Sequence, residues 1–545
     1  QIRVVKNWFQ ASSSPQKTIL PVYTPELLVS DDRIALQDQP WSYDQLPSLP
    51  VLPQVHTDVA SGTSKQFVII LHVPDGTTPG TYTSTVTFTP ENLPQRNLNL
   101  NVEVLPFLLQ ATEKDYVIYH RARIDNPASS DYTSLARYQL QVEDIAAHGF
   151  NGVAIYGYDN GWQEDKLALA NAAGITDTAI FMSAFDPDLK TLMEQYGYEP
   201  YFYGQDEPNT LDKITNDHLP KSIDIHTGGA SVVTAIQKYW ADRLKDPADE
   251  IYSGFPDGTY EPLDFINYCR DESSLQYYHD LIDGLVTSQE RETYYWQIMV
   301  EDPRVNRFMA GFFLWNTGLD GAFPYVYQHV GIYNPYDDFD AWVDTMTIYR
   351  DHLVTYPSQE GPVPTMQWEA LREGIDDVRY LEVWQGLKDQ VAANDPQLAQ
   401  TSEQVVAAAL AKYNRYTQRL ELPISDFSTD RDIIIDEILL LNDYLRNLDS
   451  QDCTLTEIIR DGIDQDCNGY DLTILVTKAT YKKGTLSVVA DSLLGAEGNM
   501  VLEGYGAMKW DTREGLWVKK VRKLSSKPAT VTVSGPEGSV TATVP

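Results

Sequence analysis

The chain is poor in cysteine, in basic residues and in long apolar runs, and each shortage excludes something. Only three of its 545 residues are Cys, too few for a disulfide-rich scaffold. No apolar stretch reaches the length of a membrane-spanning helix, so membrane insertion is not expected. Lys and Arg number 41 against 78 Asp and Glu, a formal net charge of −37. Such acidity repels phosphates, so neither nucleic acid nor an anionic membrane surface is an expected partner.

Apolar and aromatic residues are plentiful. Hydrophobic residues make up 42% of the chain, enough to bury sizeable cores, and the length fits two to four domains. The sequence also holds 34 Tyr and 11 Trp. Such rings cover sugar faces well, although most aromatic side chains of any protein pack in its core.

Local patterns divide the chain into a multidomain arrangement. Strand signals at 67–73, 82–88 and 97–105 predict an N-terminal β-sandwich accessory domain over residues 1–108. Residues 338–450 are mainly helical, and 451–471 form an Asp-rich loop. Short strands at 477–481, 485–490 and 529–533 predict a small immunoglobulin-like β-sandwich over 472–545.

Between residues 109 and 337 strands alternate with helices, several of which stop at a glycine. Eight strands are predicted, at 116–119, 152–156, 179–182, 201–203, 231–236, 263–268, 292–299 and 311–315. This alternation predicts a central (β/α)8 TIM-like barrel, with 338–450 as its helical extension.

Two adjacent acids, Asp206 and Glu207, end the short apolar strand 201–203. Acids at the end of a buried strand are costly to desolvate, which points to function. A structural role is the alternative: Asp206 or Asn209 would cap a helix that has Pro208 in its first turn. In a barrel of this kind the active site lies at the carboxyl ends of the strands, where both acids would sit.

The other predicted strand ends supply side chains that suit a carbohydrate site. Core packing is the alternative for any single one of these aromatic rings, so the hypothesis depends on the whole set. The predicted substrate-binding residues are Arg121, Tyr158, Gln205, Tyr268, Tyr295, Trp296, Trp315, Asn316 and Asp320.

The adjacency of Asp206 and Glu207 favours one mechanism. Glycosidase carboxylates usually attack from opposite sides of the sugar, about 5–9 Å apart, which neighbouring residues rarely achieve. A neighbouring pair suits substrate-assisted hydrolysis, in which the 2-acetamido oxygen of the sugar attacks the anomeric carbon. Asp206 would then orient the acetamido group and stabilise the oxazolinium. Glu207 would be the general acid and then the general base, kept protonated by the like charge and by partial burial.

The segment Tyr203-Gly-Gln-Asp-Glu-Pro208 resembles the catalytic strand end of glycoside hydrolase family 123 and related β-N-acetylgalactosaminidases. Segments 296–297, 301–307, 311–315 and 368–377 resemble the downstream half of such proteins, and the similarity covers roughly residues 1–390, thinly before 110. The resemblance implies a β-sandwich before the barrel, retention of configuration, no cofactor, and an acetamido pocket of Trp and Tyr. Tyr268 or Tyr295 would bind the acetamido oxygen. The segments 4–10 and 25–32 indicate a divergent branch.

The sequence therefore predicts a retaining, exo-acting β-N-acetylgalactosaminidase acting on glycans with a terminal N-acetylated hexosamine. One alternative is a two-carboxylate glycosidase, with Asp159, Asp264 or Asp320 as the second acid. Another is a non-catalytic carbohydrate-binding protein whose acids cap helices and form ion pairs. Arg372, Glu373 and Asp377, at helical spacing, are expected to form surface pairs of little energetic value.

The loop 461–471 is a second cluster of oxygen ligands. Asp461, Asp464, Asp466, Asn468 and Asp471 resemble the opening of a calcium-binding loop, but position twelve is Leu475 rather than Glu. Short metal-binding repeats of secreted bacterial proteins look similar and have flanking cysteines. By that resemblance Cys453 and Cys467 would form a disulfide beside a structural Ca²⁺, with Cys269 unpaired; an acidic linker with free thiols is the alternative.

The chain begins at Gln1 rather than Met and shows no signal peptide. With the expected disulfide, this predicts a secreted or cell-surface protein of bacterial type whose signal peptide is not part of the sequence. The oligomeric state is left open.

Overall fold

A computed structural model describes the chain except for residues 9–23, 35, 37–45, 75, 130, 158–161, 247, 250, 252–264, 269–290, 299–302, 330–351, 415–426, 450–458, 461–469 and 545. The chain forms two compact units. The first contains residues 1–70, 111–382 and 407–431, and the second contains 71–110, 383–406 and 432–545. None of the described helices combines the length and apolar character needed to cross a membrane.

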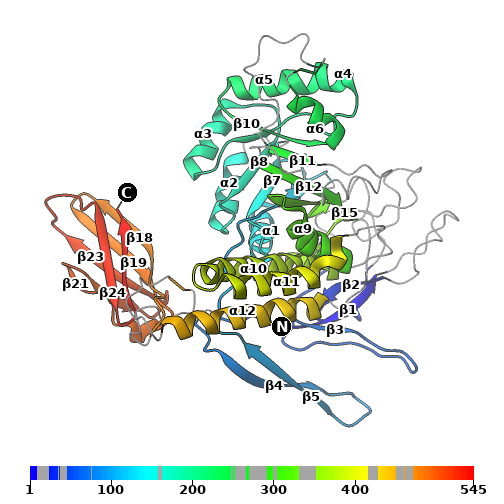
Figure 1. The fold of residues 1–545 in the computed structure, drawn as a ribbon. Helices are drawn as coiled ribbons and strands as arrows, with labels where there is room; N and C mark the ends of the chain where they lie inside the picture. The colour runs from blue at the N-terminus through cyan, green and yellow to red at the C-terminus, as the bar shows by residue number, and fades with distance from the viewer. Residues whose placement is uncertain are drawn as a thin grey trace. The chain divides into compact units, whose positions relative to one another are not determined.

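The first unit is built around a closed barrel of eight parallel strands (Figure 1). The strands are β6 (Asp115–His120), β7 (Gly152–Tyr156), β8 (Thr178–Met182), β9 (Tyr201–Tyr203), β10 (Ser231–Ile236), β11 (Phe265–Tyr268), β12 (Arg291–Gln297) and β13 (Gly321–Tyr325). Each strand pairs in parallel with the next, and β13 pairs with β6 to close the ring. The predicted TIM-like barrel is therefore present.

Alternate residues of the strands fill the barrel, as the two-residue period of a strand requires. The interior cluster is rich in tyrosine and contains Val117, Tyr119, Ala154, Tyr156, Ile180, Tyr201, Tyr203, Val233, Ala235, Phe323 and Val326, with Met182, Tyr295 and Tyr325 packed against it. Tyrosine therefore recurs at the last inward position of several strands, beside the carboxyl ends.

Short helices separate the strands, and their ends carry clear signals. The helical segments are α1 (Leu135–Ala147), α2 (Gln163–Ala172), α3 (Pro187–Tyr196), α4 (Leu211–Lys213), η3 (Ile214–His218), α5 (Leu219–Thr227), α6 (Lys238–Lys245), α8 (Pro303–Phe308), η5 (Met309–Phe313) and α9 (Leu314–Thr317). In α3, the Asp186 carboxylate accepts from two backbone N–H groups, and Gly197 ends the helix at φ 88°.

The prediction of the eighth strand was wrong. Residues 311–315 lie in the helical segments η5 and α9, and the eighth strand is β13. The run reads as apolar because the segment is buried on several sides: Phe313 packs on Tyr294 and Phe312 stacks on Tyr413. A short apolar run does not distinguish a buried strand from a buried helix.

The long helix α10 (Met366–Ala392) crosses the amino ends of the first barrel strands. Trp368 stacks on Phe150, just before β7, and the Thr112 hydroxyl, just before β6, donates to Glu382. The helix α10 lies close to α8 and η5, because a Cβ on Gly374 would lie 2.5 Å from the Arg307 carbonyl oxygen in α8 and 3.1 Å from the Gly311 nitrogen in η5. Glycine is therefore required at this position.

The expectation of surface ion pairs on α10 was wrong for Asp377, which is fully buried. Both oxygens of Asp377 accept from Arg307, at 2.7 and 2.9 Å, and one also accepts from Arg431 at 2.7 Å. Arg431, in α12 (Phe427–Asp449), also donates to Glu373 at 2.8 Å. The segments 301–307 and 368–377 thus meet in one buried network.

The remaining segments of the first unit form small antiparallel sheets. β1 (Ile2–Trp8) pairs with β2 (Thr24–Val29) and β3 (Phe67–Ile69), and β14 (Gln328–His329) with β15 (His352–Leu353). β16 (Thr355–Pro357) pairs with β17 (Pro362–Pro364). The segment η6 (Ala411–Asn414) also belongs to this unit.

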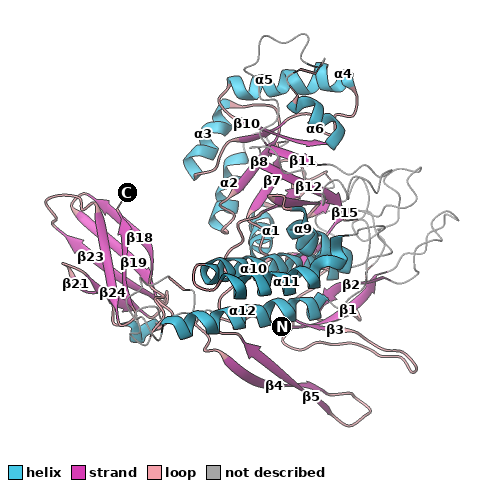
Figure 2. Cartoon of the chain, in the orientation of Figure 1, coloured by secondary structure: helices cyan, strands magenta, loops and turns pink. Residues whose placement is uncertain are grey.

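The second unit includes a two-stranded hairpin, β4 (Gly80–Phe88) and β5 (Arg96–Val104), and helix α11 (Pro396–Leu410), most of which it contains. The described strands of 1–108 thus form two separate sheets, and the N-terminal sandwich stays a prediction. The C-terminal part consists mainly of strands (Figure 2). These are β18 (Leu475–Lys482), β19 (Thr485–Asp491), β20 (Val501–Leu502), β21 (Gly506–Ala507), β22 (Lys509–Asp511), β23 (Leu516–Arg522), β24 (Thr530–Gly535) and β25 (Gly538–Thr543), with η7 (Gly495–Gly498). They form two four-stranded antiparallel sheets that share one apolar cluster.

Candidate functional site

The acid pair follows β9 in a tight turn at the carboxyl end of the barrel. Gly204 is required there, because a Cβ would lie 2.5 Å from the hydroxyl oxygen of Thr234 on β10. Its N–H donates to Val233, and the N–H of Glu207 donates to Ala235 at 3.1 Å. Glu207 has a left-handed φ of 41°, which costs a non-glycine residue about 1–2 kcal/mol. Backbone strain of this kind is concentrated at functional sites.

The structural alternative for the acid pair was wrong. The helix that follows is capped by Thr210, whose hydroxyl accepts from the Lys213 N–H, and not by Asp206 or Asn209. Asp206 and Glu207 are both exposed, so the partial burial expected for Glu207 is also absent. Neither a capping role nor a desolvated core explains the pair.

Asp206 is held by a buried phenol from its own strand. The Tyr203 hydroxyl donates to Oδ1 of Asp206 at 2.9 Å. Burial raises the pKa of Tyr203, and the charge of Asp206 adds to this, so the phenol stays protonated and keeps donating. The carboxylate thus has one oxygen fixed by the barrel, and no residue that the structure describes donates a hydrogen bond to its second oxygen.

A layer of tyrosines lines the barrel beneath the acids. The Tyr119 ring lies edge-on to Tyr295 at 6.2 Å and to Tyr325 at 5.3 Å. Tyr156 belongs to the same cluster, and burial raises its pKa. These phenols combine apolar faces with hydroxyl groups, the combination that suits the faces and hydroxyls of a sugar.

Arg121 lies directly after β6 and reaches this layer, as predicted for a residue at that strand end. Its guanidinium lies 4.7 Å from the Tyr156 ring centre, and Nη1 donates to the Tyr325 hydroxyl at 3.2 Å. Nε contacts Asp131 at 3.5 Å, and the other oxygen of Asp131 is 2.9 Å from Nδ1 of His329. Burial alone would lower the pKa of Arg121, but Tyr325, Tyr156 and Asp131 outweigh it and raise the pKa.

Sequence reasoning missed Tyr119, Tyr156, Tyr203, Tyr325, Asp131 and His329 as members of this site. The shared inward parity of the first three could have shown them, since each is at or next to the last residue of its strand. Tyr325 was hidden by the wrong eighth strand. Asp131 and His329 are 198 residues apart and lie in connecting segments, so no local pattern relates them.

Besides Arg121, some of the predicted binding residues lie at the carboxyl ends of the strands, one lies outside the described residues, and four lie elsewhere. Tyr295 packs against the inward cluster, and Gln205 accepts from Lys221 at 2.7 Å beside the acids. Tyr268 is the last residue of β11 and is in register with Tyr294. Tyr158, like the alternative acids Asp159 and Asp264, lies outside the described residues.

Four predicted binding residues do not reach the mouth. Trp296 points out of the barrel, where its indole N–H donates to Asn306 of α8 at 3.2 Å. Trp315 and Asn316 lie in α9, which precedes β13, because the strand assigned to them is a helix. Asp320 lies at the amino ends, where Oδ2 accepts from the Glu292 N–H. The assignment of these residues to the mouth was therefore wrong.

The predicted calcium loop cannot be placed. Asp461, Asp464, Asp466, Asn468, Cys453, Cys467 and Cys269 all lie outside the described residues, and only Asp471 of the ligand set is described. Within the described part, no three His, Cys, Asp or Glu side chains are arranged to hold a metal ion. The metal site and the disulfide stay predictions.

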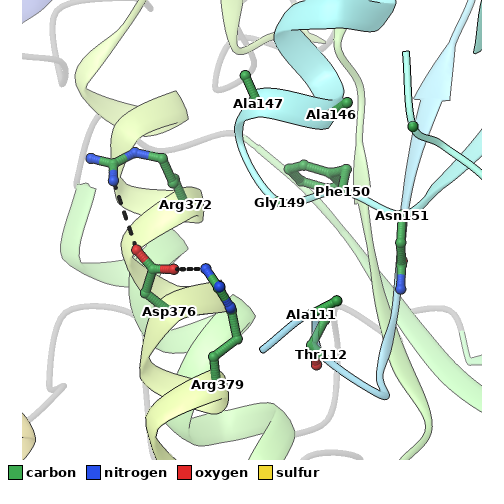
Figure 3. A pocket seen from close by; sticks show the side chains of 11 residues that line it. Ala111, Thr112, Ala146, Ala147, Gly149, Phe150, Asn151, Arg372, Asp376 and Arg379 are labelled. Carbon is green, nitrogen blue, oxygen red and sulfur yellow. Dashed lines mark hydrogen bonds and ion pairs between the residues drawn. The ribbon is translucent and has the colours of Figure 1, made fainter. Parts of the chain in front are cut away.

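A pocket of about 400 Å³ lies at the opposite end of the barrel, between α10 and the segments before β6 and β7 (Figure 3). Asp376 lies between Arg379, at 2.8 Å, and Arg372, at 3.7 Å. Burial raises the pKa of Asp376, although Arg379 opposes it. Because these charged groups bind one another, the pocket offers little to a polar ligand. The carboxyl end is therefore the better candidate site.

Comparisons with known proteins leave the function open. No family model and no curated protein matches the chain. Among solved structures, a native KDPGal structure has 12% identity and a TM-score of 0.26, covering 49% of this chain and 93% of that one. An N-acetylneuraminic acid synthetase from Leptospira borgpetersenii serovar Hardjo-bovis has 11% identity and a TM-score of 0.29, with coverage of 55% and 90%. A putative dihydrodipicolinate synthetase from Pseudomonas aeruginosa has 10% identity and a TM-score of 0.25, with coverage of 60% and 100%. Likeness at this level says nothing about substrate or reaction.

Proposed function

We propose that the chain is a retaining, exo-acting β-N-acetylgalactosaminidase that uses the acetamido group of its substrate as nucleophile. The observation that carries the proposal is the pair of exposed, adjacent acids at the carboxyl end of β9, with Asp206 fixed by Tyr203 above a layer of tyrosines. Neighbouring carboxylates can serve the same face of one sugar more readily than its two opposite faces.

In the proposed reaction Glu207 transfers protons and Asp206 binds the acetamido group. The acetamido oxygen forms a bond to the anomeric carbon while the glycosidic bond breaks, and Glu207 gives its proton to the departing oxygen. Asp206 accepts the acetamido N–H through its second oxygen and balances the positive oxazolinium. Glu207 then removes a proton from water, whose oxygen attacks the anomeric carbon and reopens the ring, giving net retention. Because Glu207 is exposed, the bound sugar itself must shield it from water.

The two-carboxylate alternative loses one of its candidates, since Asp320 lies at the wrong end of the barrel. Asp159 and Asp264 lie outside the described residues and remain candidates for the second carboxylate. The proposal also includes the finer architecture: an N-terminal β-sandwich, an immunoglobulin-like C-terminal sandwich and a calcium-bearing loop in a secreted protein.

The test is hydrolysis of chromogenic β-GalNAc, β-GlcNAc, β-galactoside and β-glucoside by the wild-type protein and Glu207→Gln. We expect turnover only of the acetamido sugars, with β-GalNAc preferred, and inhibition by a thiazoline mimic of the oxazoline. Comparable cleavage of sugars without the acetamido group would contradict substrate assistance.

Asp206→Asn separates catalysis from folding. We expect it to lose most turnover while its thermal midpoint stays at the wild-type value, because Thr210 rather than Asp206 caps the helix. A variant that melts early while the residual folded enzyme works normally would assign Asp206 a structural role.

A further inference from the structure

Arg121 is fixed at the barrel mouth in a way that leaves part of its guanidinium unused. Tyr156 lies against the cation, Tyr325 accepts from Nη1, and Asp131 contacts Nε. Within the described part of the chain, no oxygen accepts a hydrogen bond from Nη2. The Arg121 side chain as a whole is 22% exposed, so it is only partly covered by its partners.

The contact between Arg121 and Asp131 differs from the structural arginine pairs of the same protein. Arg307 binds Asp377 through two nitrogens at 2.7 and 2.9 Å, and Arg243 binds Asp249 through two nitrogens at 2.9 and 2.8 Å. Arg121 approaches Asp131 through Nε alone, at 3.5 Å. The paired donors that make arginine a good partner for an oxyanion are therefore not used up by its internal counter-ion.

Arg121 shares its surroundings with the proposed catalytic acid. The charges of Arg121 and Asp206 both act on the phenols of Tyr156 and Tyr325. The mouth thus combines a carboxylate that accepts an N–H with a guanidinium that donates to an oxyanion. A ligand that matches both needs an amide N–H and an acidic group.

We propose that Arg121 is the oxyanion-binding residue of this site, and that the substrate is an N-acetylated amino sugar glycan with an acidic substituent. The acidic group is a sulfate ester on the terminal sugar or a carboxylate on its neighbour. This inference rests on the proposed function for its sugar, and Arg121 sets specificity through contact with the substituent.

The high negative charge of the chain does not prevent such binding. A net charge of −37 disfavours anions at long range, but salt at physiological strength screens exposed charges beyond about 8 Å. A contact between a guanidinium and an oxyanion acts well inside that distance.

Asp131 and His329 position Arg121. Asp131 is almost buried and lies between the two side chains, and the loop that carries it is tied back to β6 by the Arg123 N–H, which donates to the Asp131 carbonyl. Asp131→Asn keeps the shape of the side chain and weakens its hold on the cation. We expect it to change selectivity in the same direction as loss of Arg121, and by less.

The test compares 4-nitrophenyl β-GalNAc, its 6-sulfate, and a β-GalNAc disaccharide with a uronate neighbour. We expect the wild-type protein to prefer one acidic substrate, which also identifies the source of the oxyanion. Arg121→Met should lower the acidic-to-neutral ratio of kcat/KM about 10- to 100-fold, the value of a charged hydrogen bond, and Arg121→Lys should recover part of it. The control is Arg123→Met, whose guanidinium faces Asp125. No wild-type preference, or equal losses on all substrates in Arg121→Met, would overturn the proposal.

Binding separates this inference from the proposed activity. Calorimetry with GalNAc 6-sulfate, with GalNAc bearing a glucuronate neighbour and with GalNAc alone needs no hydrolysis. Binding of one acidic ligand that Arg121→Met loses supports the oxyanion site even if no glycoside is cleaved. If the glycosides are cleaved but acidic and neutral ligands bind equally, the hydrolase proposal stands and the oxyanion site is rejected.

Discussion

The two ends of the barrel treat charge in opposite ways. At the amino ends and under α10, Asp377 is fully buried between two arginines, and His148 lies between Asp144 and Glu369 at 3.3 and 3.7 Å. At the carboxyl ends, Asp206 and Glu207 are exposed, and Asp206 accepts from a phenol rather than a cation.

This difference separates stability from chemistry. A buried carboxylate without its partners would be severely destabilising, so the amino-end charges are fixed by what surrounds them. The exposed acids at the carboxyl end lie in a turn that contains a strained residue, and strain of this kind is concentrated at functional sites. Mutations at the two ends should therefore affect different measurements, and the predictions below test that separation.

Glu207→Gln should have the largest effect. Loss of a positioned general acid lowers turnover by about 10²–10⁴-fold. The matched control is Glu199→Gln on the amino side of β9, where the carboxylate accepts from Tyr201 at 2.8 Å. Steady-state kinetics and thermal midpoints are measured for both variants, and only Glu207→Gln should lose turnover. An equal loss of turnover in both variants would contradict a functional difference between the two ends of the barrel.

Asp377→Ala should act on stability alone. Removal of this carboxylate takes away the partner of Arg307 and leaves Arg431 with Glu373 alone, and it should cost about 3–5 kcal/mol of unfolding free energy, measured by urea denaturation. The control is Glu194→Gln, which breaks an exposed pair with Lys190 and should cost less than about 0.5 kcal/mol. Similar losses in both variants would show that the buried network contributes little.

Local signals made the barrel and its acid pair predictable. Residues 201–203 form the strand expected of them, and the acids follow directly, so one short segment contains both strand and chemistry. The eighth strand was predicted at the wrong place because Pro324 makes the sequence of β13 resemble that of a loop. The entirely apolar segment 311–315 instead resembles a strand. Exposure of Glu207 and the contact of Asp131 with His329 depend on tertiary packing, which no local pattern encodes.

His148 makes the stability of the amino end depend on pH. Although burial opposes it, Asp144 and Glu369 raise the pKa of His148 to about 9. Its charged form therefore adds stability that is complete below the unfolded pKa of about 6.5 and is lost as pH rises through 9. The difference in unfolding free energy between the wild type and His148→Gln should decrease by about 2–3 kcal/mol between pH 6.5 and 9.5. A difference that stays constant would show that His148 is neutral in the folded protein.

The smallest effect comes from two tyrosines two residues apart on β9. Tyr203 donates to Asp206 at the mouth, and Tyr201 donates to Glu199 at the other end. Because each hydrogen bond to a carboxylate is worth about 1.5 kcal/mol, Tyr203→Phe should lower kcat about tenfold. KM should change little, since the phenol acts through Asp206 rather than on the sugar. Tyr201→Phe should leave kcat at the wild-type value and lower the thermal midpoint instead. If Tyr203→Phe raised KM without lowering kcat, Tyr203 would be a substrate contact, and if it only lowered the midpoint, the carboxyl end of β9 would be as structural as the amino end.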